Sequence, residues 1–160
     1  MVWTVGGVTF EAALASGFCA VLVVLSAIDV QHRIVPNRIV LPAAAVTLVA
    51  HTLLDPSPAW ALGALGASGF LFLAVLAYPK GLGMGDVKLA LLLGSMLGAT
   101  VSVALFLGFV ATLVPALVLF RRHGSAARKL AVPLVPFLSL GAVVALFLGD
   151  RILDWYLTLF

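Results

Sequence analysis

Apolar stretches alternate with short polar segments along the whole chain. Six such stretches span residues 11–30, 39–54, 59–78, 87–97, 101–120 and 133–148. An α-helix crosses a hydrocarbon core of about 30 Å with about 20 apolar residues. The pattern therefore predicts an all-α, polytopic membrane protein with about six transmembrane helices, which form a single membrane-embedded domain over residues 1–160.

The apolar region from residue 87 to residue 120 is too long for one crossing. As one helix, its 34 residues would extend about 51 Å, well past the thickness of the hydrocarbon core. Gly98, Ala99 and Thr100 offer a place to turn in the middle of this region. We therefore expect two helices, the first of which is a short crossing that enters part-way from the preceding loop.

Basic residues gather in the first, third and fifth polar segments. These residues are Arg33, Arg38, Lys80, Lys88, Arg121, Arg122, Arg128 and Lys129. Lys and Arg are enriched in the cytoplasmic loops of membrane proteins. Six crossings place all three segments on one cytoplasmic face and leave the N- and C-termini outside. A single crossing at 87–120 would instead put the most basic segment outside.

The composition excludes several classes of protein. Hydrophobic residues make up 64% of the chain and charged residues only 9%, with a mean hydropathy of +1.26. A soluble domain has about a quarter of its residues charged, which excludes a soluble globular protein, a disordered tail and a secreted disulfide scaffold. The single cysteine, Cys19, excludes an internal disulfide and a Cys-based metal site. The net charge of +3 does not indicate a nucleic-acid partner, because basic residues set the orientation of membrane proteins.

Two carboxylates stand at the edges of apolar stretches. Asp29 ends the first stretch, and Asp86 begins the fourth within a Gly-Met-Gly-Asp run. An acid at the edge of the hydrocarbon is costly and therefore indicates a functional site, and the predicted topology places both acids at cytoplasmic helix ends. Two close carboxylates tend to share one proton. The ionised one can then accept a proton from water while the protonated one donates to a carbonyl oxygen.

Two other interpretations of these acids stay open from the residues alone. Asp86 can be only a charge at a helix N-terminus, while Asp29 pairs with Arg33 four residues later. Alternatively, the two intramembrane aspartates can serve a small proton- or ion-coupled membrane transporter.

The residues around Asp86 also suggest specific roles. Gly83 and Gly85 permit unusual backbone angles and a close approach of the substrate backbone. Lys88 either favours the charged form of Asp86 or sets the orientation of the chain in the membrane. Gly94 and Gly98 are four residues apart, which predicts a close contact between two helices.

Two motifs resemble the signatures of the type IV prepilin peptidases. Asp29 is followed by Pro36 and Asn37, as in the first signature of that family. The Gly-Met-Gly-Asp run that ends at Asp86, followed by Lys88 and a leucine, looks like the second. The run VPFLSLGA at 135–142 is similar to a third stretch of the family, which reads Gly-Pro-Phe-Leu-x-Leu-Gly-Ala.

The resemblance implies an intramembrane aspartic endopeptidase of the GxGD kind, with Asp29 and Asp86 as its catalytic pair and no metal or cofactor. The supporting motif residues are Gly83, Gly85, Lys88, Pro36 and Asn37. Such enzymes sit in the cytoplasmic (inner) membrane, among its lipids. There they cut the basic leader peptide from a prepilin or pseudopilin of type IV pili or protein secretion, next to the substrate's hydrophobic N-terminal helix.

The chain departs from the family pattern at two places. Many bacterial members carry an insert with paired Cys-x-x-Cys motifs and also N-methylate the product, whereas Cys19 is the only cysteine here. This difference argues against N-methyltransferase activity and for a short, peptidase-only form. Leu134 and Val135 stand where the family often has Phe-Gly. Because these positions are distant from the acids in sequence, we expect them to affect local packing more than catalysis.

Overall fold

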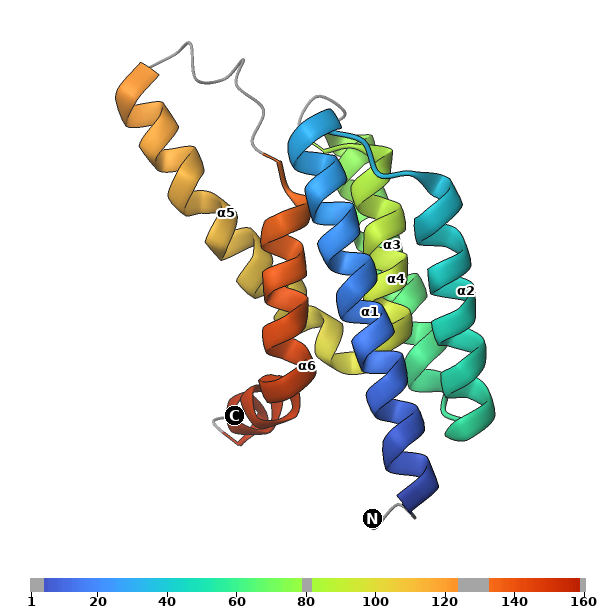
Figure 1. Cartoon of the computed structure of the whole chain (residues 1–160). Helices are drawn as coiled ribbons and strands as arrows, with labels where there is room; N and C mark the ends of the chain where they lie inside the picture. Colours follow the sequence, from blue (N-terminus) through green and yellow to red (C-terminus); the bar gives the residue numbers. More distant parts are fainter. Residues whose placement is uncertain (1–4, 79–81, 124–132, 159–160) are drawn as a thin grey trace.

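The computed structural model describes residues 5–78, 82–123 and 133–158, and all their regular structure is helical (Figure 1). The helices are α1 (Val5–His32), α2 (Asn37–Leu54), α3 (Pro58–Ala77), α4 (Met84–Leu97), the short 3-10 helix η1 (Gly98–Thr100), α5 (Val101–His123) and α6 (Val135–Leu157). The predicted all-α class is confirmed. Of the residues used in the topology argument, Lys80, Arg128 and Lys129 lie outside the described part of the chain.

The helices run alternately up and down. The ends of α1, α3 and α5 and the starts of α2, α4 and α6 point to the same end of the bundle, which we call the site end, although α5 leans away from the other helices there (Figure 1). The start of α1 and the end of α6 lie at the opposite, terminal end. This arrangement agrees with the prediction that the first, third and fifth polar segments lie on one face. Which end faces the cytoplasm stays a prediction.

The chain reverses direction at η1, where the sequence predicts a turn (Figure 1). Gly98 has φ +55° and ψ −125°, a conformation that favours glycine. By length and composition, five segments can span a membrane, and one of them, Met84–Leu119, takes in α4, η1 and most of α5. The 14 residues of α4 extend only about 21 Å, so the count of six crossings remains a prediction.

Helix α6 continues beyond the predicted end at residue 148, to Leu157. The prediction stopped where the apolar run stops, but helical hydrogen bonding does not require apolar side chains. The added turns expose Trp155 (65%) and Tyr156 (55%). Such rings are typical of a helix end at the membrane–water interface.

Glycines bring α3 and α4 into close contact. A Cβ atom on Gly94 would collide with the backbone of Gly63 and Ala64, and a Cβ on Gly63 would collide with the backbone of Gly98. The close contact predicted at Gly94 and Gly98 is therefore confirmed, with α3 as the partner helix. Small residues serve the same purpose in other membrane proteins, where they let helix backbones approach.

Hydroxyl pairs connect α2 with α4 and α1 with α6. Thr47 of α2 and Ser95 of α4 share a hydrogen bond of 2.6 Å. Ser26 of α1 donates to Ser139 of α6 at 3.0 Å. Hydrogen bonds of this kind add about 0.6 kcal/mol on average between membrane helices, so they fix relative positions more than they stabilise the bundle.

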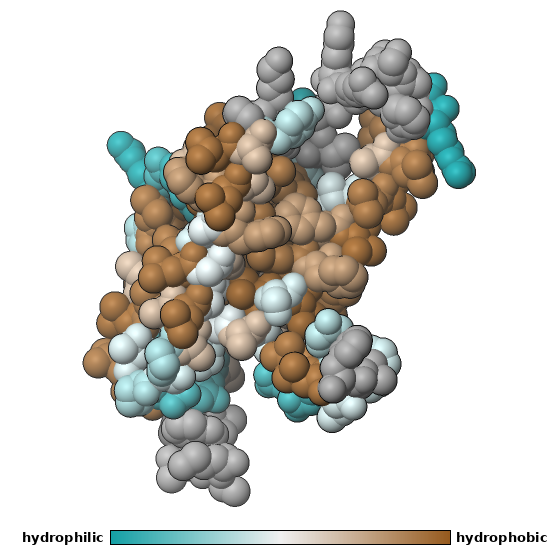
Figure 2. All heavy atoms as spheres, turned by 180° about the vertical axis from the view of Figure 1, so that it is seen from behind, coloured by the Kyte–Doolittle hydropathy of each residue, from teal (hydrophilic) through white to brown (hydrophobic). Residues whose placement is uncertain are grey.

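The outer surface of the bundle is apolar. Large hydrophobic side chains are widely exposed, such as Leu53 (78%), Leu76 (70%) and Phe147 (74%). On the face in Figure 2, hydrophobic residues cover the middle while hydrophilic ones gather towards both ends. A surface of this kind is suited to lipid and not to water.

Candidate active site

Asp29 lies in the last turn of α1 and is only 7% exposed. Its Oδ2 atom accepts a hydrogen bond of 3.2 Å from the backbone N–H of Val135, the first residue of α6. A carboxylate at this position satisfies one of the N–H groups that every helix N-terminus leaves free. The side chain therefore joins the end of α1 to the start of α6.

Asp86 lies in the first turn of α4 and is half-buried. Its Oδ2 atom accepts a hydrogen bond of 3.0 Å from the backbone N–H of Gly83, and its own N–H donates to the Gly83 carbonyl at 3.1 Å. This reciprocal pattern caps the helix. The helix-end role considered for Asp86 is thus present, but within the described part of the chain it occupies only one carboxylate oxygen.

The two aspartates line one cavity of about 330 Å³ at the site end. The other walls come from the segment between α1 and α2, the start of α4 and the residues just before α6; they are Arg33, Ile34, Val35, Gly83, Gly85, Lys88, Pro133 and Leu134. The positive ends of two helix dipoles, those of α4 and α6, lie beside the pair.

Arg33 does not form the ion pair with Asp29 that the sequence suggests. Its backbone is left-handed, with φ 55°, and its N–H closes α1 on the carbonyl of Asp29 at 2.8 Å. This conformation takes the side chain off the helix face on which a pair four residues apart would form. Arg33 still lines the cavity.

Lys88, Pro36 and Asn37 connect α4 with α2. The Lys88 ammonium donates a hydrogen bond of 2.7 Å to Oδ1 of Asn37. Pro36 precedes the first turn of α2, and its carbonyl accepts from Ile39 and Val40 at 3.1 Å. The hydrogen bond of Lys88 thus goes to Asn37 and not to Asp86, so these three residues support the shape of the site.

The two glycines of the Gly-Met-Gly-Asp run differ in how closely the chain packs around them. Among the described glycines, Gly98 alone has a positive φ, and Gly83 is ordinary extended backbone with φ −95° and ψ 156°. Neither glycine of the run thus uses the left-handed backbone angles that its missing Cβ permits. Gly85 is needed for packing, because a Cβ there would lie 2.9 Å from Cγ2 of Val35. A Cβ on Gly83 would meet Oδ2 of Asp86 at an ordinary 3.7 Å.

The start of α6 is part of the site, which the sequence did not predict. Leu134 lines the cavity and the Val135 N–H contacts Asp29. Their distance from the acids in sequence is misleading, because the fold brings the start of α6 to the end of α1. That these positions affect packing more than catalysis stays a prediction. A signal was available in the motif-like run at 135–142, which begins a helix whose free N–H groups need an acceptor.

A second polar cavity, of about 520 Å³, lies at the terminal end. Its lining includes Glu11, His51, Asp55, Trp60 and Asp150, and the rings of His51 and Trp60 stack with centroids 4.2 Å apart. Leucines that are at most 1% exposed fill the bundle between the two cavities: Leu22, Leu25, Leu89, Leu92 and Leu93. Among the described residues, no three His, Cys, Asp or Glu side chains gather as a metal site would require.

Residues 16–119 match the model of a protein family described as the type IV leader peptidase family. The matched region contains both Asp29 and Asp86 and ends before α6. No solved structure matches the chain.

Curated relatives carry the name prepilin leader peptidase/N-methyltransferase. The relative from Bacillus subtilis (strain 168) is 34% identical over 94% of this chain and 62% of its own length. Relatives from Legionella pneumophila and Aeromonas hydrophila are 29% and 32% identical, over 94% and 88% of this chain and 55% and 51% of their own. The chain thus spans between about half and two thirds of the relatives it matches.

Proposed function

The chain belongs to the type IV leader peptidase family, and from this premise we propose that it is an aspartic endopeptidase that removes the leader peptide of prepilin-like proteins. One observation carries the proposal. Asp29 and Asp86 come from separate helices and separate motifs, yet they line the same cavity. A pair of carboxylates in a partly closed polar cavity is the arrangement that aspartic proteases use.

In the proposed reaction, a water molecule lies between the two carboxyl groups. The ionised aspartate takes a proton from this water as its oxygen attacks the scissile carbonyl carbon, while the protonated aspartate donates to the carbonyl oxygen. The product of this attack is a tetrahedral intermediate with two hydroxyl groups. As its C–N bond breaks, the aspartate that took the proton from water gives it to the leaving nitrogen, and the other aspartate takes a proton back from one hydroxyl group. A carboxylic acid and a free amine result, and the pair returns to its starting state. Oδ2 of each aspartate accepts a backbone hydrogen bond, which holds both carboxylates in place.

In the proposed complex, the substrate crosses the membrane and its cleaved bond lies at the level of the cavity. By the helix in or next to which each lies, five of the six described Lys and Arg residues lie at the site end: Arg33, Arg38, Lys88, Arg121 and Arg122. The sixth, Arg151, lies at the terminal end with the acids Glu11, Asp55, Asp150 and Asp154. By the positive-inside rule, the site end faces the cytoplasm. A basic leader would then stay in the cytoplasm while the hydrophobic helix that follows it lies in the bilayer of the cytoplasmic membrane.

The test is cleavage of a type IV prepilin by the purified protein in detergent, with the mass of the N-terminal fragment as the readout. Asp29→Asn and Asp86→Asn should each abolish cleavage without changing insertion or unfolding. Asp150→Asn is the matched control, because Asp150 is an acid at the opposite end of the bundle. Full cleavage by either site variant, or equal loss in the control, would overturn the assignment of the pair.

The transporter alternative predicts a path for ions between the two ends of the bundle. The fully buried leucines lie between the two polar cavities, which speaks against such a path. Proton flux in proteoliposomes that disappears in Asp29→Asn, together with intact prepilin, would favour the transporter. A peptidase dyad instead predicts cleavage that falls at both low and high pH, because one carboxyl group must hold a proton and the other must not.

A further inference from the structure

We propose that the groove between α1 and α2 binds the apolar helix of the substrate and so delivers the bond to be cut to Asp29 and Asp86. This inference rests on the proposed peptidase function and adds the surface by which the substrate is held. The groove is distinct from the cavity of the two acids, because its lining residues all lie further along the membrane-spanning helices.

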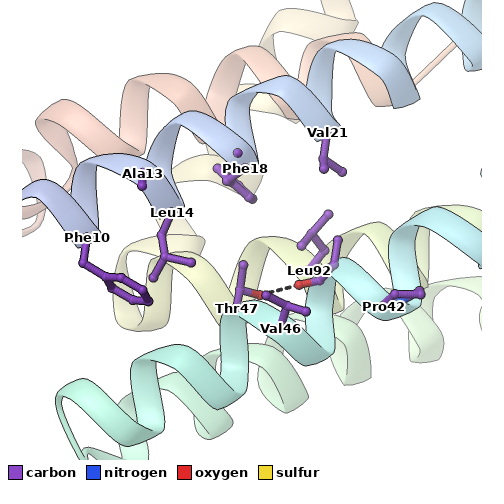
Figure 3. A pocket seen from close by; sticks show the side chains of 11 residues that line it. Phe10, Ala13, Leu14, Phe18, Val21, Pro42, Val46, Thr47 and Leu92 are labelled. Atoms are coloured by element: carbon purple, nitrogen blue, oxygen red, sulfur yellow. Dashed lines mark hydrogen bonds between the residues drawn. The ribbon is translucent and has the colours of Figure 1, made fainter.

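The groove has a volume of about 400 Å³ and is apolar along its length. Figure 3 shows the side chains that α1 points towards α2: Phe10, Leu14, Phe18 and Val21. Val46 and Thr47 form the opposite wall, and Leu92 of α4 lies between the two helices. The Thr47 hydroxyl already donates a hydrogen bond to the carbonyl of Ala43 at 3.0 Å (Figure 3). The groove is therefore better suited to an apolar occupant than to a polar one.

The register of α1 connects this groove with the catalytic pair. Phe18 and Asp29 are separated by eleven residues, or three turns, which puts them on the same face of the helix and about 16 Å apart along its axis. From Phe10 to Asp29 the distance is about 28 Å, close to the hydrocarbon thickness of about 30 Å. The groove is lined by α1 from Phe10 to Val21, about 16 Å of the helix. An apolar helix that lies in the groove and continues along α1 reaches the level of Asp29.

The segment that joins α1 to α2 leaves the lipid side of this groove open. Val35, in the middle of that segment, packs against Gly85 at the start of α4, and α4 also supplies Leu92 to the groove. No residue of the connection lines the groove. On the outer side, Phe10 is 46% and Val46 is 61% exposed, so a helix can enter sideways from the bilayer.

A second apolar groove, between α3 and α5, provides the comparison. It is larger, about 690 Å³, but it is lined by Ala59, Gly98 and Ala99 at the terminal end and reaches only to Phe70 and Phe109. Neither α3 nor α5 carries Asp29 or Asp86, so a helix that continues along this groove has no member of the acid pair in line with it. Size alone would favour the α3–α5 groove, whereas the position of Asp29 on α1 favours the groove between α1 and α2.

Two glycines allow a matched experiment. A Cβ atom added to Gly17, in the α1–α2 groove, or to Gly66, in the α3–α5 groove, meets nothing within 4 Å. Gly17→Leu and Gly66→Leu should therefore both fold and insert. We expect Gly17→Leu to lower kcat/KM for a full-length type IV prepilin about ten-fold, equivalent to about 1.4 kcal/mol of lost binding. Gly66→Leu should cleave the same prepilin like the wild type.

A photo-crosslinking amino acid at position 17 or 66, in the Asp29→Asn background, gives a readout that does not need cleavage. The prepilin helix should crosslink to position 17 and not to position 66. Crosslinks from position 66 alone, from both positions equally, or only to lipid or a second copy at position 17 would overturn the proposed groove, as would normal cleavage by Gly17→Leu. Failure of the proposed function is a separate result, namely no cleavage of the prepilin by the wild type.

Discussion

Replacing Gly85 with alanine tests how closely the α1–α2 segment packs on α4. The new Cβ would lie 2.9 Å from Cγ2 and 3.0 Å from Cβ of Val35, closer than side-chain atoms normally approach. Overpacking of this kind costs about 1–3 kcal/mol. Alanine also gains up to about 1 kcal/mol over glycine in a helix, so the net loss in unfolding free energy should be about 1–2 kcal/mol.

Gly83→Ala is the control, because its Cβ would meet only ordinary contacts at 3.7 and 3.8 Å. We expect its unfolding free energy to stay within about 0.5 kcal/mol of the wild type. Both variants can be measured by reversible unfolding in mixed micelles and by prepilin cleavage. Gly85→Ala should also slow cleavage, because Val35 lies between the helix of Asp29 and the helix of Asp86.

Val35→Ala supplies the decisive comparison. It removes both Cγ atoms of Val35, so Gly85→Ala should cost less in this background than in the wild type. The coupling expected for residues in direct contact is about 0.5–3 kcal/mol. Additive effects of the two substitutions, or equal stability of the Gly85→Ala and Gly83→Ala variants, would refute the packing argument.

Three further predictions follow from contacts of the described residues. Lys88→Met and Asn37→Ala should each lower the unfolding free energy by about 0.5–1 kcal/mol. Their effects should not add in a double-mutant cycle, because both remove the same 2.7 Å hydrogen bond, and additive losses would contradict this. Arg33→Gly should raise the melting temperature by relieving about 1 kcal/mol of left-handed strain at φ 55°, and an unchanged melting temperature would argue against the strain. Gly94→Ala should destabilise by about 3 kcal/mol or more, because its Cβ would collide with the backbone of α3. Gly69→Ala, which meets open space, should be neutral, and similar losses in both would refute the predicted collision.

Local pattern was enough to predict the order of the helices and the turn at Gly98. The length of each apolar stretch predicts the length of its helix. Gly98, with φ +55°, ends α4 within the apolar region that is too long for one crossing. The same reasoning put Asp29 and Asp86 at neighbouring helix ends, and the two line one cavity. Successive membrane helices must alternate in direction. The end of each odd-numbered helix therefore lies on the same face as the start of each even-numbered one.

Contacts between distant parts of the chain could not be predicted in this way. The hydrogen bond from Val135 to Asp29 and that from Lys88 to Asn37 depend on which helices are neighbours, and hydropathy carries no information about neighbours. The left-handed backbone of Arg33 was also missed, because arginine gives no local signal for that conformation.

The atom of Val135 that holds Asp29 belongs to the main chain. Every amino acid except proline provides this N–H donor, so substitution at position 135 preserves the anchor while changing only what surrounds it. The side chain of Val135 is fully buried, so a substitution there disturbs the packing where α6 begins and leaves the donor to Asp29 in place. Variation at this position therefore tests the surroundings of the anchor and not the anchor itself.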